Sequence, residues 1–162
     1  MNDENLIVPP SDGTAIIFNG AGTPFEETKF PLSKNLDKHE ILVSISLSTV
    51  CGSDLHTWQG HRPFPTPCIL GHEMVGKIIE LGNDIKNDYN GDNLAKGDRI
   101  VWSMTVGCGD CYFCNHDLPQ KCVKLFKYGH AQSDNHPYFT GGFAKYVILK
   151  KKPLKLAGFK LI

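Results

Sequence analysis

The sequence predicts one mainly β domain with little helix. Short stretches rich in isoleucine, valine and leucine recur along the chain, and glycine, proline or polar turns separate them. The 162 residues are an ordinary length for one domain, and no apolar run is long enough to span a bilayer. Several short strands of this kind are typical of a small barrel or a sandwich-like fold. We therefore expect a soluble β domain with sparse helix.

Five stretches carry the strand pattern. The clearest is residues 40–50, in which Ile41, Val43, Ile45 and Leu47 occupy alternate positions, as the side chains on one face of a strand do. The other four predicted strands are residues 14–18, 73–81, 98–104 and 142–149.

Helix and loop signals fill the rest of the chain. Residues 51–58 predict one short helix, and Pro119 opens a turn. Glycine, proline and polar residues gather in residues 20–24, 62–67 and 82–98, which predicts loops there. The sequence has no internal repeat and no low-complexity tract.

The charge balance argues against nucleic-acid and membrane partners. Acidic and basic residues number 17 each, so no net field attracts a phosphate backbone or an anionic lipid surface. The cationic run at residues 149–155 is interpreted as a solvated tail. The first ten residues lack the basic and then apolar pattern of a secretory signal. Together with cysteines spaced for metal, this favours a reducing cytoplasm.

Four of the six cysteines, Cys108, Cys111, Cys114 and Cys122, lie within one short segment. Four thiolates drawn together by tight turns form the closed tetrahedral set that a structural zinc prefers. Disulfides are a weaker alternative, because two-residue gaps would close strained loops. An iron–sulfur cluster is the sharper rival, although ferredoxin runs continue with a three-residue gap and a proline. His116 is interpreted as a solvent-facing bystander or a less favoured substitute ligand.

A second group of metal-binding residue types follows two apolar stretches. Cys51 offers a thiolate, His72 an imidazole and Glu73 a carboxylate, and such a set suits a zinc site that keeps one position open. The site is not the HExxH of a zincin, because Gly76 stands where the second histidine would be. Taken alone, these residues would be interpreted as core or surface positions.

The motifs in combination resemble a known family. These are CGSDLH at residues 51–56, GHE at 71–73, KGDRIVW at 96–102, the four-cysteine segment, and GGFAKYVIL at 141–149. In this order they resemble the N-terminal catalytic domain of zinc-dependent medium-chain alcohol dehydrogenases, which has the GroES-like fold. A narrower likeness, LPQKC followed by KYGH, resembles a subgroup associated with phosphonate metabolism.

The resemblance implies a fold and its boundaries. We expect a GroES-like β-barrel domain over residues 1–150, with short helices and a zinc lobe at about residues 105–128. Residues 151–162 are expected to be a basic tail or a truncated junction.

The resemblance also implies roles for the second group. Cys51 and His72 match ligands of the catalytic zinc, and Glu73 matches a carboxylate that binds the metal or sits beside it. Asp54 matches an acid that accepts a hydrogen bond from His72 and raises its basicity. Capping of the helix after residue 50 is a second role open to Asp54.

The implied chemistry is the exchange of a hydride between a small alcohol or aldehyde and NAD or NADP, with zinc as Lewis acid. Ser53 matches the hydroxyl that takes the alcohol proton, and His56 matches the residue that next receives this proton and transfers it to solvent. Trp58, His61 and Phe64 are candidates to line the substrate cleft.

Four further residues carry weaker expectations. Cys68 is interpreted as a small buried apolar residue. His39, His130 and His136 have no motif partner.

The dinucleotide fingerprint of the family has no counterpart in this sequence. Gly20 and Gly22 are followed by Pro24 and Phe25, so no helix can begin there and the third glycine is missing. We expect a catalytic-domain portion that is inactive by itself, with no cofactor-binding residues of its own. It would need a complementary C-terminal half, or would self-associate through an exposed sheet edge. The alternative is a non-catalytic zinc-binding or interaction module that has kept the fold.

Overall fold

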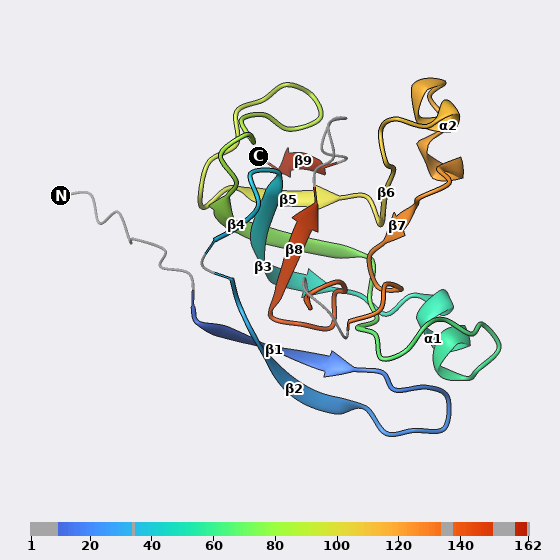
Figure 1. Cartoon of the computed structure of the whole chain (residues 1–162). Coiled ribbons are helices and arrows are strands. Elements are labelled where there is room, and N and C mark those ends of the chain that lie inside the picture. The colour runs from blue at the N-terminus through green and yellow to red at the C-terminus, as the bar shows by residue number, and fades with distance from the viewer. Residues whose placement is uncertain (1–9, 34, 134–137, 151–157, 162) are drawn as a thin grey trace.

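The computed structural model describes residues 10–33, 35–133 and 138–150, together with the backbone of residues 158–161. Its centre is a five-stranded antiparallel sheet in the order β8-β3-β4-β5-β9, and a hairpin of β1 and β2 packs beside it (Figure 1). The elements are β1 (Asp12–Ile17), β2 (Glu26–Pro31), β3 (Glu40–Ser48), α1 (Gly52–Trp58), β4 (Met74–Leu81), β5 (Arg99–Trp102), β6 (Thr105–Val106), α2 (Tyr112–Asn115), η1 (Pro119–Lys121), β7 (Phe126–Lys127), β8 (Tyr146–Lys150) and β9 (Gly158–Leu161).

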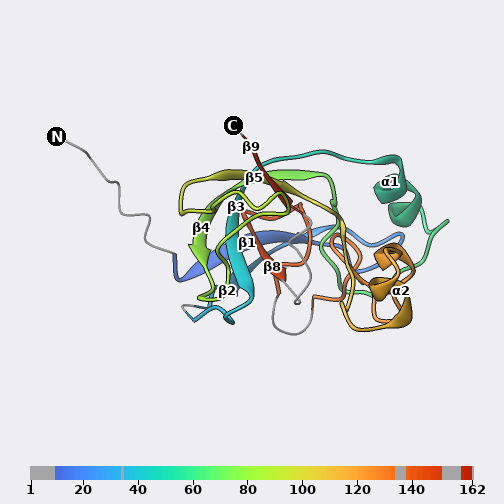
Figure 2. The same ribbon diagram turned by 90° about the horizontal axis from the view of Figure 1, so that it is seen from above.

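The mainly β prediction is confirmed, and so are the helix after residue 50 and the turn at Pro119. Each of the five predicted strands overlaps an observed strand, although the last one begins at residue 146 and not at 142. Among the described residues the helices are short, and none is long and apolar enough to cross a membrane. Both α1 and α2 lie at one end of the molecule, away from the start of β1 (Figure 2).

Strand β3 lies between two hydrophobic cores. Ile41 and Val43 face a core with Met74, while Leu42 faces a second core with Ile148, because successive side chains of a strand point to opposite faces. This is why the first half of the strand is apolar at consecutive positions rather than strictly alternating. The pattern ends at Leu47, whose side chain is 61% exposed.

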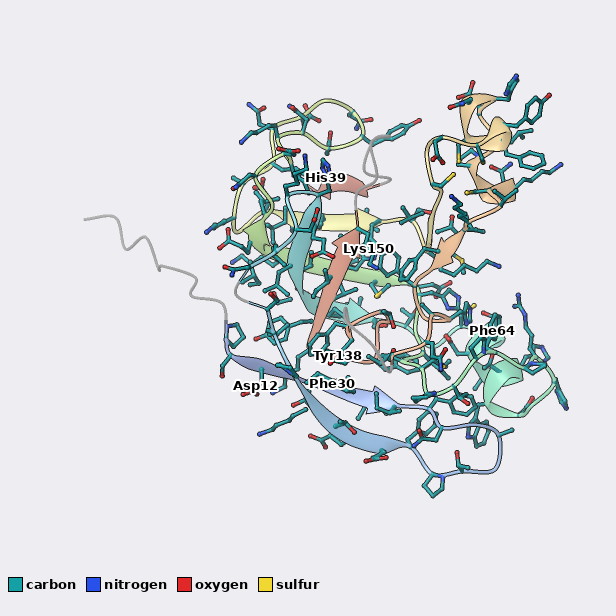
Figure 3. All side chains as sticks on the ribbon, in the orientation of Figure 1. Asp12, Phe30, His39, Phe64, Tyr138 and Lys150 are labelled. Carbon is teal, nitrogen blue, oxygen red and sulfur yellow. The ribbon has the colours of Figure 1, made fainter. Side chains whose placement is uncertain are left out.

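The β1–β2 hairpin closes one side of the barrel. The backbone N–H of Ile16 donates to the carbonyl of Phe143 at 2.8 Å, and Lys145 returns a bond to Thr14 at 2.9 Å. The ring of Phe30 on β2 stacks on Tyr138 with centroids 5.0 Å apart (Figure 3). Strand β2 was not predicted, because its residues EETKFP are mostly exposed and lack an apolar run.

The region expected to be a tail or junction contains a strand of the main sheet. Residues Gly158–Leu161 form β9, which pairs antiparallel with β5 from Arg99↔Leu161 to Trp102↔Gly158. This edge of β5 is therefore covered within the chain itself. Only four residues make the strand, and the lysines around them hid the pattern from sequence reasoning. Residues 151–157 lie outside the described part.

Tyr128 closes the core next to β8. Its side chain is buried, and its hydroxyl accepts the backbone N–H of Lys150 at 2.8 Å. Burial raises the pKa of Tyr128 well above its ordinary value, and the nearby Glu40 adds to the effect, while the Lys150 bond opposes it. The folded protein therefore keeps this tyrosine neutral at a pH where an unfolded chain ionises it.

We expect Tyr128→Phe to lower the free energy of unfolding by about 1 to 3 kcal/mol near neutral pH, because the Lys150 N–H loses its acceptor. Above about pH 10 the wild type should lose stability by up to roughly 1.4 kcal/mol per pH unit, because only its unfolded state releases the tyrosine proton. The variant should lack this component of the slope. Denaturant unfolding from pH 8 to 11.5 measures both, with the exposed Tyr112→Phe as control. If the free energy of unfolding fell equally with pH in wild type and Tyr128→Phe, the raised pKa assigned to Tyr128 would be wrong.

Candidate metal centres

The four-cysteine segment folds into a lobe at one end of the barrel. The ribbon of β6 and β7 leads into it and out of it, and α2 and η1 form its turns (Figure 1). The sulfur atoms of Cys108, Cys111, Cys114 and Cys122 all lie within 4.8 Å of one another. All four are free thiols rather than disulfides.

Backbone N–H groups point at the sulfur atoms. The N–H of Cys108 donates to the Cys122 sulfur at 3.1 Å, and the N–H of Lys124 donates to the same sulfur at 3.3 Å. At Cys111, a hydrogen bond from the backbone of Cys114 lowers the pKa of the thiol to about 6, against the opposing effect of burial, whereas a hydrogen bond with the Asp110 side chain raises the pKa of Cys108. The backbone bonds stabilise thiolates, so the site fits a tetrahedral zinc.

His116 is not part of the sulfur cluster. Its ring stacks on Tyr112 with centroids 4.0 Å apart, and its Nδ1 lies 2.8 Å from the Tyr112 carbonyl oxygen. This placement agrees with the interpretation of His116 as a bystander that does not bind the metal.

The second centre gathers residues from two segments. Cys51 precedes α1, while His72 and Glu73 precede β4, and their ligand atoms lie within 4.8 Å of one another. They line a cleft of about 670 Å³. The other residues of its lining are mostly apolar: Leu47, Thr49, Met74, Val75, Val101, Trp102 and Met104.

Asp54 ties the two segments together. Its side chain is 2% exposed; Oδ2 accepts the N–H of Cys51 at 2.9 Å, and Oδ1 accepts the N–H of Gly71 at 3.2 Å. The bond to Cys51 caps α1, and the bond to Gly71 connects α1 to the segment that carries His72. Asp54 therefore performs both functions. Oδ1 also faces His72 Nδ1 across 3.4 Å, which is too long for a good hydrogen bond, and Nδ1 has no hydrogen-bond partner among the described residues.

The backbone before His72 is held by close glycine contacts. Gly129 has φ +76° and packs so tightly that a Cβ on it would lie 2.5 Å from the Gly71 oxygen and 3.1 Å from the His72 Cβ. Only glycine fits this position, since both the conformation and the contact exclude a side chain. The fold therefore fixes the backbone that carries His72.

Ser53 lies beside the ligands. Its hydroxyl is 3.2 Å from His72 Nε2 and 3.5 Å from the Cys51 sulfur. With Nδ1 of His72 facing Asp54, Nε2 is the nitrogen available to a metal ion. A thiolate, an imidazole and a carboxylate with an adjacent hydroxyl make a donor set that fits a zinc with an open position.

His56 lies on the last turn of α1, and its ring is 5.9 Å from that of His61. No described contact joins His56 to Ser53, so the relay between them stays a prediction. Trp58, His61 and Phe64 are not among the residues that line the cleft, and Trp58 is 46% exposed.

His130 was given no partner by the sequence, yet it lies against His72. The ring centroids are 5.1 Å apart, and Phe64 stacks on the other side of His130 at 4.2 Å (Phe64 is labelled in Figure 3). Burial, and then the neighbouring His72, lower the pKa of His130 to about 4, so the ring is neutral at neutral pH. The contact joins residues 58 positions apart in sequence, and no local pattern signals it.

The remaining residues with sequence expectations have ordinary surroundings. Cys68 is fully buried with Phe18 and Leu70, which confirms its interpretation as a small core residue, and burial raises the pKa of its thiol to about 11. His39 lies 3.6 Å from Asp84 at the surface. His136 lies outside the described residues.

The fold and the two sulfur-containing centres define a GroES-like domain of the zinc-type medium-chain dehydrogenases. The family described as alcohol dehydrogenase GroES-like domain matches residues 37–156, and the chain belongs to it.

Similar proteins carry the same family identity. Zinc-type alcohol dehydrogenase B of Aspergillus flavus is 33% identical over 72% of this chain and 24% of its own length. Sorbitol dehydrogenase of Halalkalibacterium halodurans is 36% identical over 72% of this chain and 31% of its own. The crystal structure of an alcohol dehydrogenase from Thermotoga maritima superposes with a TM-score of 0.82 and 32% identity, covering 93% of this chain and 41% of that one. The chain thus spans well under half the length of these relatives.

Proposed function

We propose that this chain is the catalytic-domain portion of a zinc-dependent alcohol dehydrogenase. It would oxidise a small alcohol or reduce an aldehyde by hydride exchange with NAD or NADP. The observation that carries the proposal is the convergence of Cys51, His72 and Glu73 in one cleft, beside the hydroxyl of Ser53. The zinc-type dehydrogenases among the relatives support it.

The metal ligands, Asp54 and the lining of the cleft would have different roles in the reaction. Cys51, His72 and Glu73 would hold a zinc ion, which supplies Lewis acidity toward an alcohol or carbonyl oxygen. Asp54 orients the His72 segment through its bond to Gly71. The apolar lining of the cleft, including Met74 and Trp102, would face the reacting carbon.

The proton would leave through side chains of α1. Ser53, next to His72 Nε2, would take the proton of the alcohol hydroxyl, and His56 would pass it to solvent. The nicotinamide would be held by a nucleotide-binding portion, for which the described residues offer no phosphate cradle. That portion would come from a complementary C-terminal half. The phosphonate-associated subgroup, self-association and a cytoplasmic setting stay predictions.

A matched pair of proteins tests the proposal. The purified, metal-replete chain should give no detectable NAD(P)-dependent alcohol oxidation. The same chain joined to the nucleotide-binding domain of the Thermotoga maritima relative should oxidise small alcohols. His72→Ala should abolish this activity, and Ser53→Ala should lower kcat by about 10² to 10⁴-fold, the usual contribution of general acid–base catalysis.

Two outcomes would contradict the proposal in different ways. Turnover by the chain alone would show that the catalytic-domain portion is sufficient. A folded, zinc-loaded chimera without activity on any alcohol or aldehyde would favour the alternative, a zinc-binding or interaction module.

A further inference from the structure

Thr49 makes two contacts with the acidic residue of the second metal centre. Its hydroxyl donates a short hydrogen bond to Oε2 of Glu73, and its backbone N–H donates to the Glu73 carbonyl oxygen at 3.1 Å. The resemblance to dehydrogenases gave Thr49 no role. It also left open whether Glu73 binds the metal or sits beside it.

The position of Thr49 follows from the sheet. Ser48 pairs with Met74 in the β3–β4 ladder, so the next residues along, Thr49 and Glu73, also lie opposite each other. Leu47, Thr49 and Cys51 then occupy alternate positions, and all three line the cleft. One register therefore brings a hydroxyl to the carboxylate and, two residues later, a thiolate to the same site.

Thr49 holds one oxygen of the Glu73 carboxylate, and no residue in the described part of the chain hydrogen-bonds to the other oxygen. Glu73 is exposed, and without a partner its carboxylate would rotate among several conformations in water. A hydroxyl on one oxygen fixes the plane of the group, as the partners of metal-binding carboxylates do. The other oxygen remains available to a metal ion held by Cys51 and His72.

We propose that Thr49 is the positioning residue that makes Glu73 a ligand of the second metal centre through a single oxygen. The inference rests on the proposed function only in requiring that a metal occupies this centre. This part of the chain then supplies three protein ligands by itself, and the metal needs no further protein ligand to bind.

The test measures metal affinity, not activity. The probe is Co²⁺, added to protein whose four-cysteine site is kept filled with zinc, and a competing chelator sets the free metal concentration. Cobalt absorption in the visible range reports both occupancy and coordination. Thr49→Val removes the hydroxyl, keeps the side-chain shape and retains the backbone N–H, so it isolates the bond to Oε2.

We expect Thr49→Val to weaken cobalt binding by about 10 to 100-fold, the usual loss when the partner of a metal ligand is removed. Thr49→Ser retains the hydroxyl and should stay within about threefold of wild type by the same reasoning. Glu73→Gln should weaken binding by at least as much as Thr49→Val. Denaturant unfolding verifies that the barrel of each variant is folded, and Thr49→Ala provides a second deletion of the hydroxyl.

A double variant separates positioning from a general structural effect. If Thr49 acts through Glu73, then Thr49→Val added to Glu73→Gln should cause no further loss. The proposal would be overturned if Thr49→Val reduced cobalt affinity equally in the wild type and in the Glu73→Gln variant. It would also be overturned if the Thr49→Val variant bound cobalt with wild-type affinity. His72→Ala must abolish cobalt binding; if it does not, the metal centre itself is wrong, and this outcome is distinct from a failure at Thr49.

Discussion

Replacement of Cys111 by serine is expected to release the tightly held zinc and to open the lobe that contains it. The four sulfur atoms form a complete set of ligands, and zinc binding at such sites contributes folding free energy on the order of 10 kcal/mol. Metal analysis of the purified wild type should find about one zinc that resists a mild chelator. A second zinc, at the Cys51 centre, should be removed first.

His72→Ala is the matched control for this prediction. It should eliminate the labile metal and leave the tight zinc in place, because His72 does not belong to the sulfur cluster. Zinc content after graded chelation, measured on both variants, distinguishes the centres. A Cys111→Ser protein that keeps its tight zinc, beside a His72→Ala protein that has lost it, would reverse the assignment of the two sites.

Asp54→Asn is expected to lower the free energy of unfolding by about 1 to 3 kcal/mol, the cost of leaving a buried donor unsatisfied. The two carboxylate oxygens of Asp54 accept different backbone N–H groups, from Cys51 and from Gly71. An amide has only one oxygen, so its NH₂ must face one of these donors. Metal affinity at the Cys51 centre should fall by about 10 to 100-fold, because both ligand segments depend on this side chain.

Asp84→Asn is a suitable control for Asp54→Asn. Asp84 is an exposed acid whose ion pair with Lys38, at 3.2 Å, lies in solvent and should contribute little. Thermal or denaturant unfolding measures stability, and cobalt titration measures the metal site. Equal stabilities for the two variants would show that the buried carboxylate does not join the segments in solution.

Features encoded within a few neighbouring residues were the ones that the sequence made predictable. The four cysteines lie within fifteen residues, and their spacing alone indicates a closed zinc site. The strand β3 and the helix after Cys51 follow from local patterns in the same way. Cys51 and His72 are 21 residues apart, and their common role came only from the resemblance to a family.

Contacts between distant segments could not be predicted. His130 reaches His72, Gly129 supports Gly71, and Thr49 reaches Glu73, all through backbone paths that the barrel fixes. Strand β2 is mostly exposed and polar, so its residues show no apolar pattern. Strand β9 is identified by its pairing with β5, because its own four residues show no strand pattern. Local patterns specify elements, whereas register and packing decide which side chains meet.

The lobe and the barrel differ in how their order is maintained. The two-residue strands β6 and β7 form their own small sheet, separate from the five-stranded sheet, and the hydrophobic cluster within the lobe consists mainly of the cysteines themselves. Little apolar area supports the lobe apart from its sulfur atoms, whereas the barrel contains two extensive cores. We therefore expect the lobe and the barrel to open as two cooperative units, whose amide hydrogens exchange with solvent through different opening reactions. Zinc supply should then set the opening free energy of the lobe, and hydrophobic burial should set that of the barrel.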